Sequence, residues 1–297
     1  MKQAFFICAL LIGFTSGVLA QHVPLFSQYF FNPQGINPAN AGFNDVLDAS
    51  IIHRRQWVSF EGAPLTTQLN LHTALYDKRM SLGTNIENDR IGVTNRTMVN
   101  FIYAYRLFFK PEKYLSFGIS TGLGQLRNDW DKIKTTVSGD PVYNTGNESR
   151  LFFRGGAGMV YTSPKLHLGF SSPTLFQTRP FSENNAQQFL FHGKYTQAIN
   201  EVAEILPSAL IRIQKNSPVQ ADINTVFRFY ELYSFGIGYR LNDAFIFTTA
   251  VKFSNQFEMG YAYDFTLSPI QSYSNGSHEI MLRYVFAYPV TAVRPRY

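Results

Sequence analysis

The chain has 297 residues, of which 16% are aromatic and 15% are charged, and its formal net charge is +6. Its Lys and Arg residues are scattered, with Arg54-Arg55 as the densest cluster, whereas a nucleic-acid-binding protein gathers them on one face. After about the first 20 residues, no apolar run approaches the roughly 18 to 20 residues that a helical membrane span needs. Composition thus argues against helical spans and against nucleic acid as a partner, and it favours short alternating strands.

Residues 1–20 have the organisation of a secretory signal peptide. Lys2 precedes an apolar run from Ala4 to Phe14, and small residues end the segment at Ala20, which suits cleavage by signal peptidase. We therefore expect an exported protein. The chain's single cysteine, Cys8, lies inside this signal, so the mature protein is expected to contain no disulfide and no thiolate metal site.

Residues 21–45 form a second segment, which precedes the first predicted strand. Prolines and glycines stand among its aromatic residues between Phe26 and Gly42, so neither a strand nor a helix is expected there. Two interpretations remain open at this point. The segment either plugs or lines the interior of the structure that the later strands build, or it is a periplasmic leader that packs at the rim.

Residues 46–288 carry the main pattern of the sequence, in which apolar residues alternate with polar or small ones. Such alternation over about ten residues is typical of strands that have one apolar and one polar face. Clear runs occupy 65–75, 99–107, 115–123, 219–229, 233–239, 245–253, 257–267 and 280–286. With the weaker runs between them, the pattern predicts about fourteen strands.

The predicted fold is all-β: a transmembrane, outer-membrane, antiparallel β-barrel with one strand face toward lipid and the other toward a polar lumen. A secreted β-sandwich would show similar alternation, but the consecutive hairpins and the repeated aromatics on one face favour the barrel. Long loops are predicted from Leu126 to Arg150 and from Pro173 to Asn185, because both stretches are rich in turn-forming residues. Residues 289–297 are expected to form a short C-terminal tail.

No residues with a catalytic, cofactor-binding or metal-binding pattern are expected. Ser277, His278 and Glu279 are adjacent, but neighbours on a strand point to opposite faces, which argues against a working nucleophile and base pair. The other histidines have no paired spacing of the kind that holds a metal. Gly155, Gly156 and Gly158 lack the context of a phosphate-binding loop and are better explained as small positions in a strand. The sequence therefore argues against an enzyme.

Several polar residues are candidates for binding a partner protein. Asp264, Glu279 and Arg283 are predicted to face the lumen, where Asp264 and Arg283 are expected to form a charge pair that neutralises itself. Arg54, Arg55 and Trp57 either contact a partner or mark the membrane boundary, where Trp beside Arg is common. With two residues of the N-terminal segment, the candidates are Asn37, Pro38, Arg54, Arg55, Trp57, Asp264, Glu279 and Arg283.

Blocks of sequence near both ends of the chain resemble the PorP/SprF family of type IX secretion and gliding-motility membrane proteins. The first blocks are Phe26-Ser27-Gln28-Tyr29-Phe30-Phe31-Asn32-Pro33 and Ile36-Asn37-Pro38-Ala39-Asn40-Ala41-Gly42, followed by Arg54-Arg55-Gln56-Trp57-Val58 and Gly62-Ala63-Pro64. The last are Gly260-Tyr261-Ala262-Tyr263-Asp264-Phe265 and Gly276-Ser277-His278-Glu279-Ile280-Met281-Leu282. The blocks occur in the family's order, although Asn40 stands where the family often has an aromatic residue.

The resemblance implies a non-enzymatic protein of the cell outer membrane in Bacteroidetes-type bacteria. It implies that such a barrel, embedded in outer-membrane lipid, binds and anchors type IX substrates or assists their export. The implied partner is the C-terminal domain of a secreted adhesin or another type IX substrate, with periplasmic ring components as a further partner. A passive diffusion channel is the alternative, because fourteen strands can leave a water-filled lumen.

Overall fold

The computed structural model describes residues 25–75, 77–133, 146–178, 187–214 and 217–286. The expected signal peptide and C-terminal tail lie outside these residues. Within the described part, no helix is long and apolar enough to cross a membrane.

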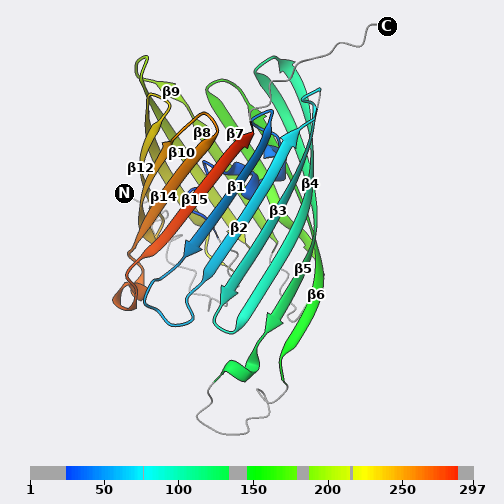
Figure 1. The fold of residues 1–297 in the computed structure, drawn as a ribbon, viewed down its shortest axis with the longest axis vertical. Coiled ribbons are helices and arrows are strands. Elements are labelled where there is room, and N and C mark those ends of the chain that lie inside the picture. The colour runs from blue at the N-terminus through cyan, green and yellow to red at the C-terminus, as the bar shows by residue number, and fades with distance from the viewer. Residues whose placement is uncertain (1–24, 76, 134–145, 179–186, 215–216, 287–297) are drawn as a thin grey trace, which may run out of the picture.

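Fourteen antiparallel strands of eight residues or more form one closed barrel in the described residues (Figure 1). Each strand pairs with its neighbours in the chain, and β1 pairs with β15 to close the ring. A two-residue strand, β9 (Gln197–Ala198), pairs with β10 alone. The barrel strands are β1 (Leu47–Arg55), β2 (Leu65–Ala74), β3 (Met80–Ile91), β4 (Thr94–Lys110), β5 (Lys113–Asn128), β6 (Glu148–Thr162), β7 (Leu166–Gln177), β8 (Gln188–Tyr195), β10 (Ala203–Gln214), β11 (Gln220–Phe229), β12 (Tyr233–Arg240), β13 (Ala244–Lys252), β14 (Phe257–Thr266) and β15 (Ser277–Phe286).

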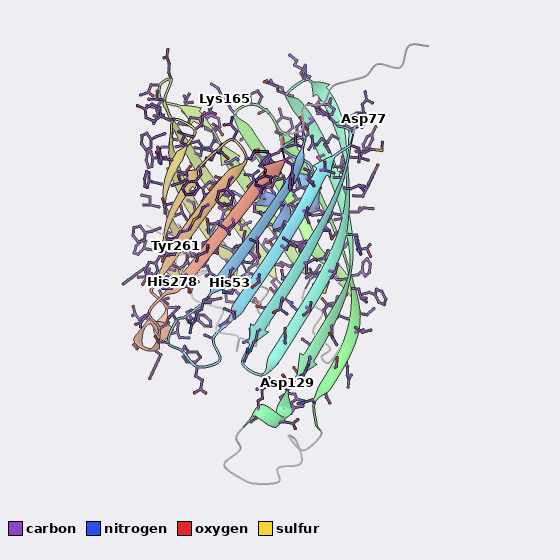
Figure 2. The ribbon with its side chains drawn as sticks, in the orientation of Figure 1. His53, Asp77, Asp129, Lys165, Tyr261 and His278 are labelled. Atoms are coloured by element: carbon purple, nitrogen blue, oxygen red, sulfur yellow. The ribbon has the colours of Figure 1, made fainter. Side chains whose placement is uncertain are left out.

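The alternation in the sequence corresponds to the two faces of the barrel wall. In β2 the buried residues are Thr66, Gln68, Asn70 and His72, which face the lumen. In β13 the exposed residues are aromatic, and Figure 2 shows side chains projecting outward along both sides of the barrel in this view. Closure leaves no unpaired sheet edge, so the backbone hydrogen bonds are satisfied without water, as a barrel in hydrocarbon requires. The predicted fold and strand number are therefore confirmed.

The two ends of the barrel differ in the length of their connections. At the end where β1 begins and β15 ends, hairpins are as short as 111–112 and 163–165, and we call it the short-turn end. At the opposite end the connections 56–64, 129–147 and 267–276 are longer, and we call it the long-loop end. Lys165 and Asp129, which lie near opposite ends in Figure 2, mark the two.

Two predicted loops are partly strand. β5 continues to Asn128 and β6 begins at Glu148, so both ends of the loop predicted from Leu126 to Arg150 belong to strands. Residues 134–145 of that loop lie outside the described part. β7 runs through Pro173, where a loop was predicted to start, and residues 179–186 lie outside the described part. Its pairing with β8 shifts register between Ser171 and Thr174. Such an irregularity accommodates a proline, which cannot donate to the sheet ladder.

The chain before β1 contains two short 3₁₀ turns, η1 (Pro33–Gly35) and η2 (Pro38–Asn40). Each begins with a proline, whose fixed φ and missing N–H suit the first position of a helical turn. The sequence predicts neither a strand nor a helix here. The structure has no strand in this stretch, but the two short 3₁₀ turns are helical and were not predicted. Further 3₁₀ turns, η3 (Trp130–Lys132) and η4 (Pro269–Tyr273), lie in long loops.

Candidate functional site

Residues 25–45, which we call the N-terminal segment, run through the interior of the barrel. Figure 1 shows its short turns, in blue, enclosed by the barrel strands. Near its start, Ser27 is bonded to residues at the long-loop end of β14 and β15, and near its end Asp45 pairs with Arg106, near the short-turn end of β4. The segment therefore spans much of the lumen before the chain enters the wall as β1.

Apolar side chains of the segment are buried against the few apolar positions of the lumen face. Leu25, Tyr29 and Ile36 pack in one cluster with Leu190 of β8 and Leu210 of β10. A second cluster joins the wall residues Ile52, Ala250 and Met281 to two aromatic residues of the segment, Phe26 and Phe31. Burying each large apolar side chain stabilises the contact by roughly 1.5–3 kcal/mol, so these clusters hold the segment against two sides of the lumen.

A buried network of charges holds the start of the segment. The Arg54 guanidinium lies 2.7 Å from the Asp264 carboxylate and 3.2 Å from the Glu279 carboxylate. The Ser27 hydroxyl donates to Asp264 at 2.7 Å, and the Ser27 N–H donates to Glu279 at 2.8 Å. Glu279 also accepts the Gln28 N–H at 2.9 Å. Because an unpaired ion inside a protein is costly, these groups stabilise one another and fix the segment's position.

Two further residues extend this network around the wall. Arg240 of β12 lies 2.9 Å from the Asp264 carboxylate and 3.0 Å from that of Asp222 on β11. Arg240 also donates to the Ser27 hydroxyl at 3.1 Å. We call Ser27, Arg54, Asp222, Arg240, Asp264 and Glu279 the Ser27 network. It links β1, β11, β12, β14 and β15 to Ser27 of the segment.

The predicted charge pair between Asp264 and Arg283 is wrong. Arg283 pairs with Asp48 at 2.6 Å and with Glu258 at 3.2 Å, near the short-turn end. Asp264 lies opposite Ser277 in the register, six residues from Arg283 along β15, which is roughly 20 Å at the rise of a strand. Both residues do face the lumen, but each is neutralised by a different partner.

The membrane-boundary interpretation is also wrong for Arg54, because its side chain points into the lumen and is almost fully buried. Arg55, the next residue along the strand, is exposed on the outer face. Trp57 follows the end of β1, is half-buried, and donates its backbone N–H to the Ser277 hydroxyl at 3.1 Å. For Arg55 and Trp57 both interpretations stay predictions.

Asn37 and Pro38 lie in the middle of the N-terminal segment and are buried. The Asn37 side-chain oxygen accepts the Ala39 N–H at 2.9 Å, which caps η2. Its amide nitrogen donates to the backbone carbonyls of Met159 and Phe170 at 3.1 and 3.2 Å. Their polar atoms therefore connect parts of this chain to each other, and a partner-binding role for either residue stays a prediction.

η2 approaches the wall closely at β5. A Cβ atom added to Gly118 would lie 2.2 Å from the Ala39 backbone nitrogen, so only glycine allows this contact. Next to it, the Ser116 hydroxyl donates to the Ala39 carbonyl at 2.7 Å, and on β7 the Ser171 hydroxyl donates to the Ile36 carbonyl at 2.7 Å. Small lumen residues thus satisfy backbone groups that the irregular segment leaves unpaired.

On the long-loop side of the segment lies a cavity of about 60 Å³ that is lined by both polar and apolar side chains. A chain of hydrogen-bonded amides leads along β2, β3 and β4 to this cavity and consists of Gln68, Asn70, Asn85 and Asn100. Arg154 of β6 lines the same cavity, and its guanidinium donates to Asn100 at 3.4 Å. Arg154 forms no ion pair with any described residue, and the carboxylate of Glu87, which lines the same cavity, pairs with Arg96 at 3.0 Å.

The structure also bears on the enzyme alternative. Ser277 and Glu279 are buried on the lumen side, whereas His278 faces outward and its Nδ1 lies 2.7 Å from the Tyr261 hydroxyl, two side chains labelled in Figure 2. The prediction that these neighbours point to opposite faces is confirmed. Among the described residues no group of three or more His, Cys, Asp and Glu side chains could hold a metal ion.

Sequence reasoning predicted only part of this site. It identified Asn37, Arg54, Asp264 and Glu279 as polar candidates but missed Ser27, Asp222 and Arg240, and also Asp48 and Glu258 as the partners of Arg283. The missed charged residues share a sequence signal, since each is an isolated charge on the otherwise polar or small face of an alternating strand. Ser27 lies inside a recognised sequence block, but its role depends on contacts with distant residues.

A family model described as "Type IX secretion system membrane protein PorP/SprF" matches residues 18–284. The chain belongs to this family. The match includes the N-terminal segment and all strands through most of β15, so the resemblance seen in the sequence blocks is confirmed. No curated protein sequence matches the chain.

Solved structures of similar shape are outer-membrane barrels. The Ralstonia pickettii toluene transporter TbuX matches with a TM-score of 0.52 at 10% identity, over 86% of this chain and 93% of TbuX. The monoaromatic hydrocarbon channel CymD matches with a TM-score of 0.51 at 10% identity, over 91% of this chain and 95% of CymD. At such identities the likeness shows the fold alone.

Fold and family together place this PorP/SprF protein in the outer membrane, as predicted. Bacterial outer-membrane barrels have short turns on the periplasmic side and long loops on the outside. We therefore assign the short-turn end to the periplasm and the long-loop end to the cell exterior. The Ser27 network then lies toward the exterior. After η2, the N-terminal segment leaves the lumen at the periplasmic end.

Proposed function

We propose that this protein is an outer-membrane socket, closed by its own N-terminal segment, that holds a type IX secretion substrate at the cell surface. The observation that carries the proposal is the Ser27 network, which fixes the segment inside the lumen through two hydrogen bonds from the Ser27 hydroxyl and N–H to buried carboxylates. A segment fixed in this way closes the lumen and gives a partner a rigid surface to bind. A binding site functions best when rigid elements hold its residues in position.

The chemistry of the long-loop end supports a protein as the ligand. The cavity on the long-loop side of the segment presents side-chain amides, the Glu87 carboxylate and the Arg154 guanidinium, which together suit the N–H groups, carbonyl oxygens and carboxylates of a peptide. Around it, the long loops expose apolar side chains such as Phe60 and Tyr273. Aromatic and Arg residues are enriched where protein partners bind.

We infer that the ligand is the C-terminal domain of a secreted adhesin or another type IX substrate. The cavity is small, so one or two side chains of the partner would enter it while the rest of the domain contacts the loops. Contact with periplasmic ring components would then involve the short-turn end. Of the predicted partner-binding residues, Arg55 and Trp57 remain accessible to such a partner. The others are buried inside the barrel or its segment, except Arg283, which is partly buried and paired with two acids in the lumen.

The experiment is affinity purification of the tagged protein from outer membranes in mild detergent, with mass spectrometry of the bound proteins. We expect a surface adhesin or another type IX substrate to co-purify with the native protein and to be lost from Arg154→Met. Arg90→Met is the matched control, because Arg90 is exposed on the outer face near the long-loop end of β3. Purification of the barrel alone, or equal recovery from both variants, would contradict the proposal.

A passive diffusion channel is the competing function, and conductance in planar bilayers separates the two. A socket closed by its segment is expected to conduct poorly and to conduct strongly after deletion of residues 26–42. A native protein that conducts well, with no change on deletion, would indicate a channel. Electrophoretic mobility before and after heating shows whether the deletion variant has folded.

A further inference from the structure

A second cavity lies on the periplasmic side of the N-terminal segment and has a volume of about 200 Å³. One wall is made by the segment and is mostly apolar, with Tyr29, Phe30, Ile36 and Phe43. The other wall comes from strands between β5 and β10 and from the hairpin 163–165. The cavity is therefore amphipathic, with its polar groups gathered on one side.

The polar wall contains cationic and donor groups in one row of the sheet. His167 of β7 and Ser208 of β10 both lie directly opposite Lys194 of β8 in the strand register. Lys194 forms no ion pair and no hydrogen bond with any described residue. The Nε2 atom of His167 is buried and also has no hydrogen-bond partner among them, while its Nδ1 lies 3.1 Å from the Thr162 hydroxyl.

The remaining polar groups do not neutralise this wall. None of the described residues that line the cavity is acidic, and Lys165 adds a second ammonium group at the hairpin. Glu204, on a neighbouring strand, is paired with Arg228 at 3.4 Å. His192 is already engaged, because its Nε2 lies 3.2 Å from the Asn37 amide nitrogen. An uncompensated ammonium and an unpartnered imidazole nitrogen, both inside a lumen, are costly unless an anion joins them.

We propose that this cavity binds a carboxylate carried on an apolar group, with the anion between Lys194 and His167 and the apolar part against the aromatic residues of the segment. A cavity of about 150 Å³ is known to hold benzene, so 200 Å³ accommodates one ring with one carboxylate. Lys194 supplies a charge-assisted hydrogen bond, the stronger kind, to the carboxylate. The site is separate from the long-loop cavity and does not depend on the proposed anchoring function.

The ligand's access is from the periplasm. Ser163, Pro164 and Lys165 line the cavity and belong to the hairpin at the short-turn end, and Lys165 lies at that end in Figure 2. Two kinds of ligand carry a carboxylate on an apolar group. One is a free aromatic or aliphatic acid, and the other is the C-terminus of a peptide that ends in an apolar residue. The two are distinguished by comparing probes.

The test uses the full-length protein in detergent and ¹⁹F NMR of 4-fluorobenzoate. We expect saturable binding by the native protein and no binding of the neutral analogue 4-fluorobenzamide. Binding should be at least about tenfold weaker in Lys194→Met, which keeps most of the length of the side chain but removes the charge. Lys113→Met, an exposed lysine on the outer face at the same end, should bind like the native protein. Equal binding by Lys194→Met, or equal binding of the amide, would overturn the proposal.

A second measurement requires no variant. Photolysis with 4-azidobenzoate, followed by mass spectrometry, should label residues 29–43, 162–167 or 192–196, and excess benzoate should prevent it. Labelling confined to other regions would contradict the site. A short peptide ending in Phe that competes with 4-fluorobenzoate, while its C-terminal amide does not, would assign the peptide terminus as ligand; competition by free acids alone would assign a small molecule.

Discussion

The guanidinium of Arg54 lies 2.7 Å from the carboxylate of Asp264, although the two residues are 210 positions apart in the chain. Both side chains are at most 3% exposed. Their contact lies beside the pairing of β1 with β15 that closes the barrel, and the Ser27 hydroxyl of the N-terminal segment is hydrogen-bonded to both side chains. The fold, the closure of the barrel and the position of the segment therefore depend on one another.

Replacing Asp264 with Asn should destabilise the barrel. The amide keeps the shape of the carboxylate but leaves Arg54 and Arg240 with too little negative charge, and breaking a buried ion pair on one side costs about 3–5 kcal/mol. The measurement is the temperature at which the folded, faster-migrating form disappears on electrophoresis. Asp77→Asn is the control, because Asp77 is exposed on a turn and surface substitutions change stability by about 0.5 kcal/mol or less. Equal melting of both variants would show that the Ser27 network contributes little.

Ser27→Ala should loosen the segment without opening the barrel. The hydroxyl donates to Asp264 and accepts from Arg54 and Arg240, and hydrogen bonds to charged groups contribute about 1.5–3 kcal/mol each. Hydrogen exchange measured by mass spectrometry should be at least about tenfold faster in residues 25–31, with the strands unchanged. The control Ser254→Ala removes a hydroxyl from a turn at the barrel surface. Unchanged exchange in the segment would mean that the apolar clusters alone hold it.

Gly118→Val should displace η2 from the barrel wall. A side chain at this position meets the backbone of Ala39, which cannot move aside as a flexible side chain can. We expect a cysteine placed at Ala39, in a chain whose Cys8 is replaced by Ser, to react with a small thiol reagent much faster when Gly118→Val is present. Gly193→Ala is the matched control, because an added Cβ there lies no closer than 3.0 Å to a neighbouring atom. Equal reaction rates would place the segment elsewhere.

Phe247→Arg should test the position of the bilayer. Phe247 is exposed on the outer face at the middle of β13, whereas Phe253 is exposed just past the strand's short-turn end. Arg on the lipid face costs roughly 2–4 kcal/mol at the bilayer midplane and about 0–1 kcal/mol near the interface. Urea unfolding in lipid vesicles should therefore show a clear loss for Phe247→Arg and a small one for Phe253→Arg. Equal losses of stability in the two variants would contradict the placement of Phe247 nearer the bilayer midplane than Phe253.

The barrel wall could be predicted well from the sequence, because strand alternation is a local property. The faces assigned to the runs that became β2 and β13 match the observed burial, since side chains on a strand alternate whatever lies around them. The prediction failed where local composition misleads. Pro173 signals a loop, yet its strand is held in the sheet by neighbours on both sides and tolerates the proline through an irregular register.

The N-terminal segment shows where such reasoning ends. Its prolines and glycines exclude regular structure, but they do not distinguish a rim from a lumen. That choice depends on acids that lie 237 and 252 residues further along the chain. Closure of the barrel places these carboxylates at the height of Ser27 in the lumen. The aromatic residues of the segment then pack against apolar side chains of the lumen wall.

By itself, the sequence determined the kind of protein: an exported barrel with an apolar outer face, a polar inner face and an irregular leading segment, recognisable by its family blocks. The tertiary structure decided which charges meet. Asp264 pairs with Arg54 and Arg240, while Arg283 pairs with Asp48 and Glu258. The physical reason is that alternation sets only the face of a side chain, whereas its height in the lumen and its neighbours depend on strand register and on closure between the first and last strands.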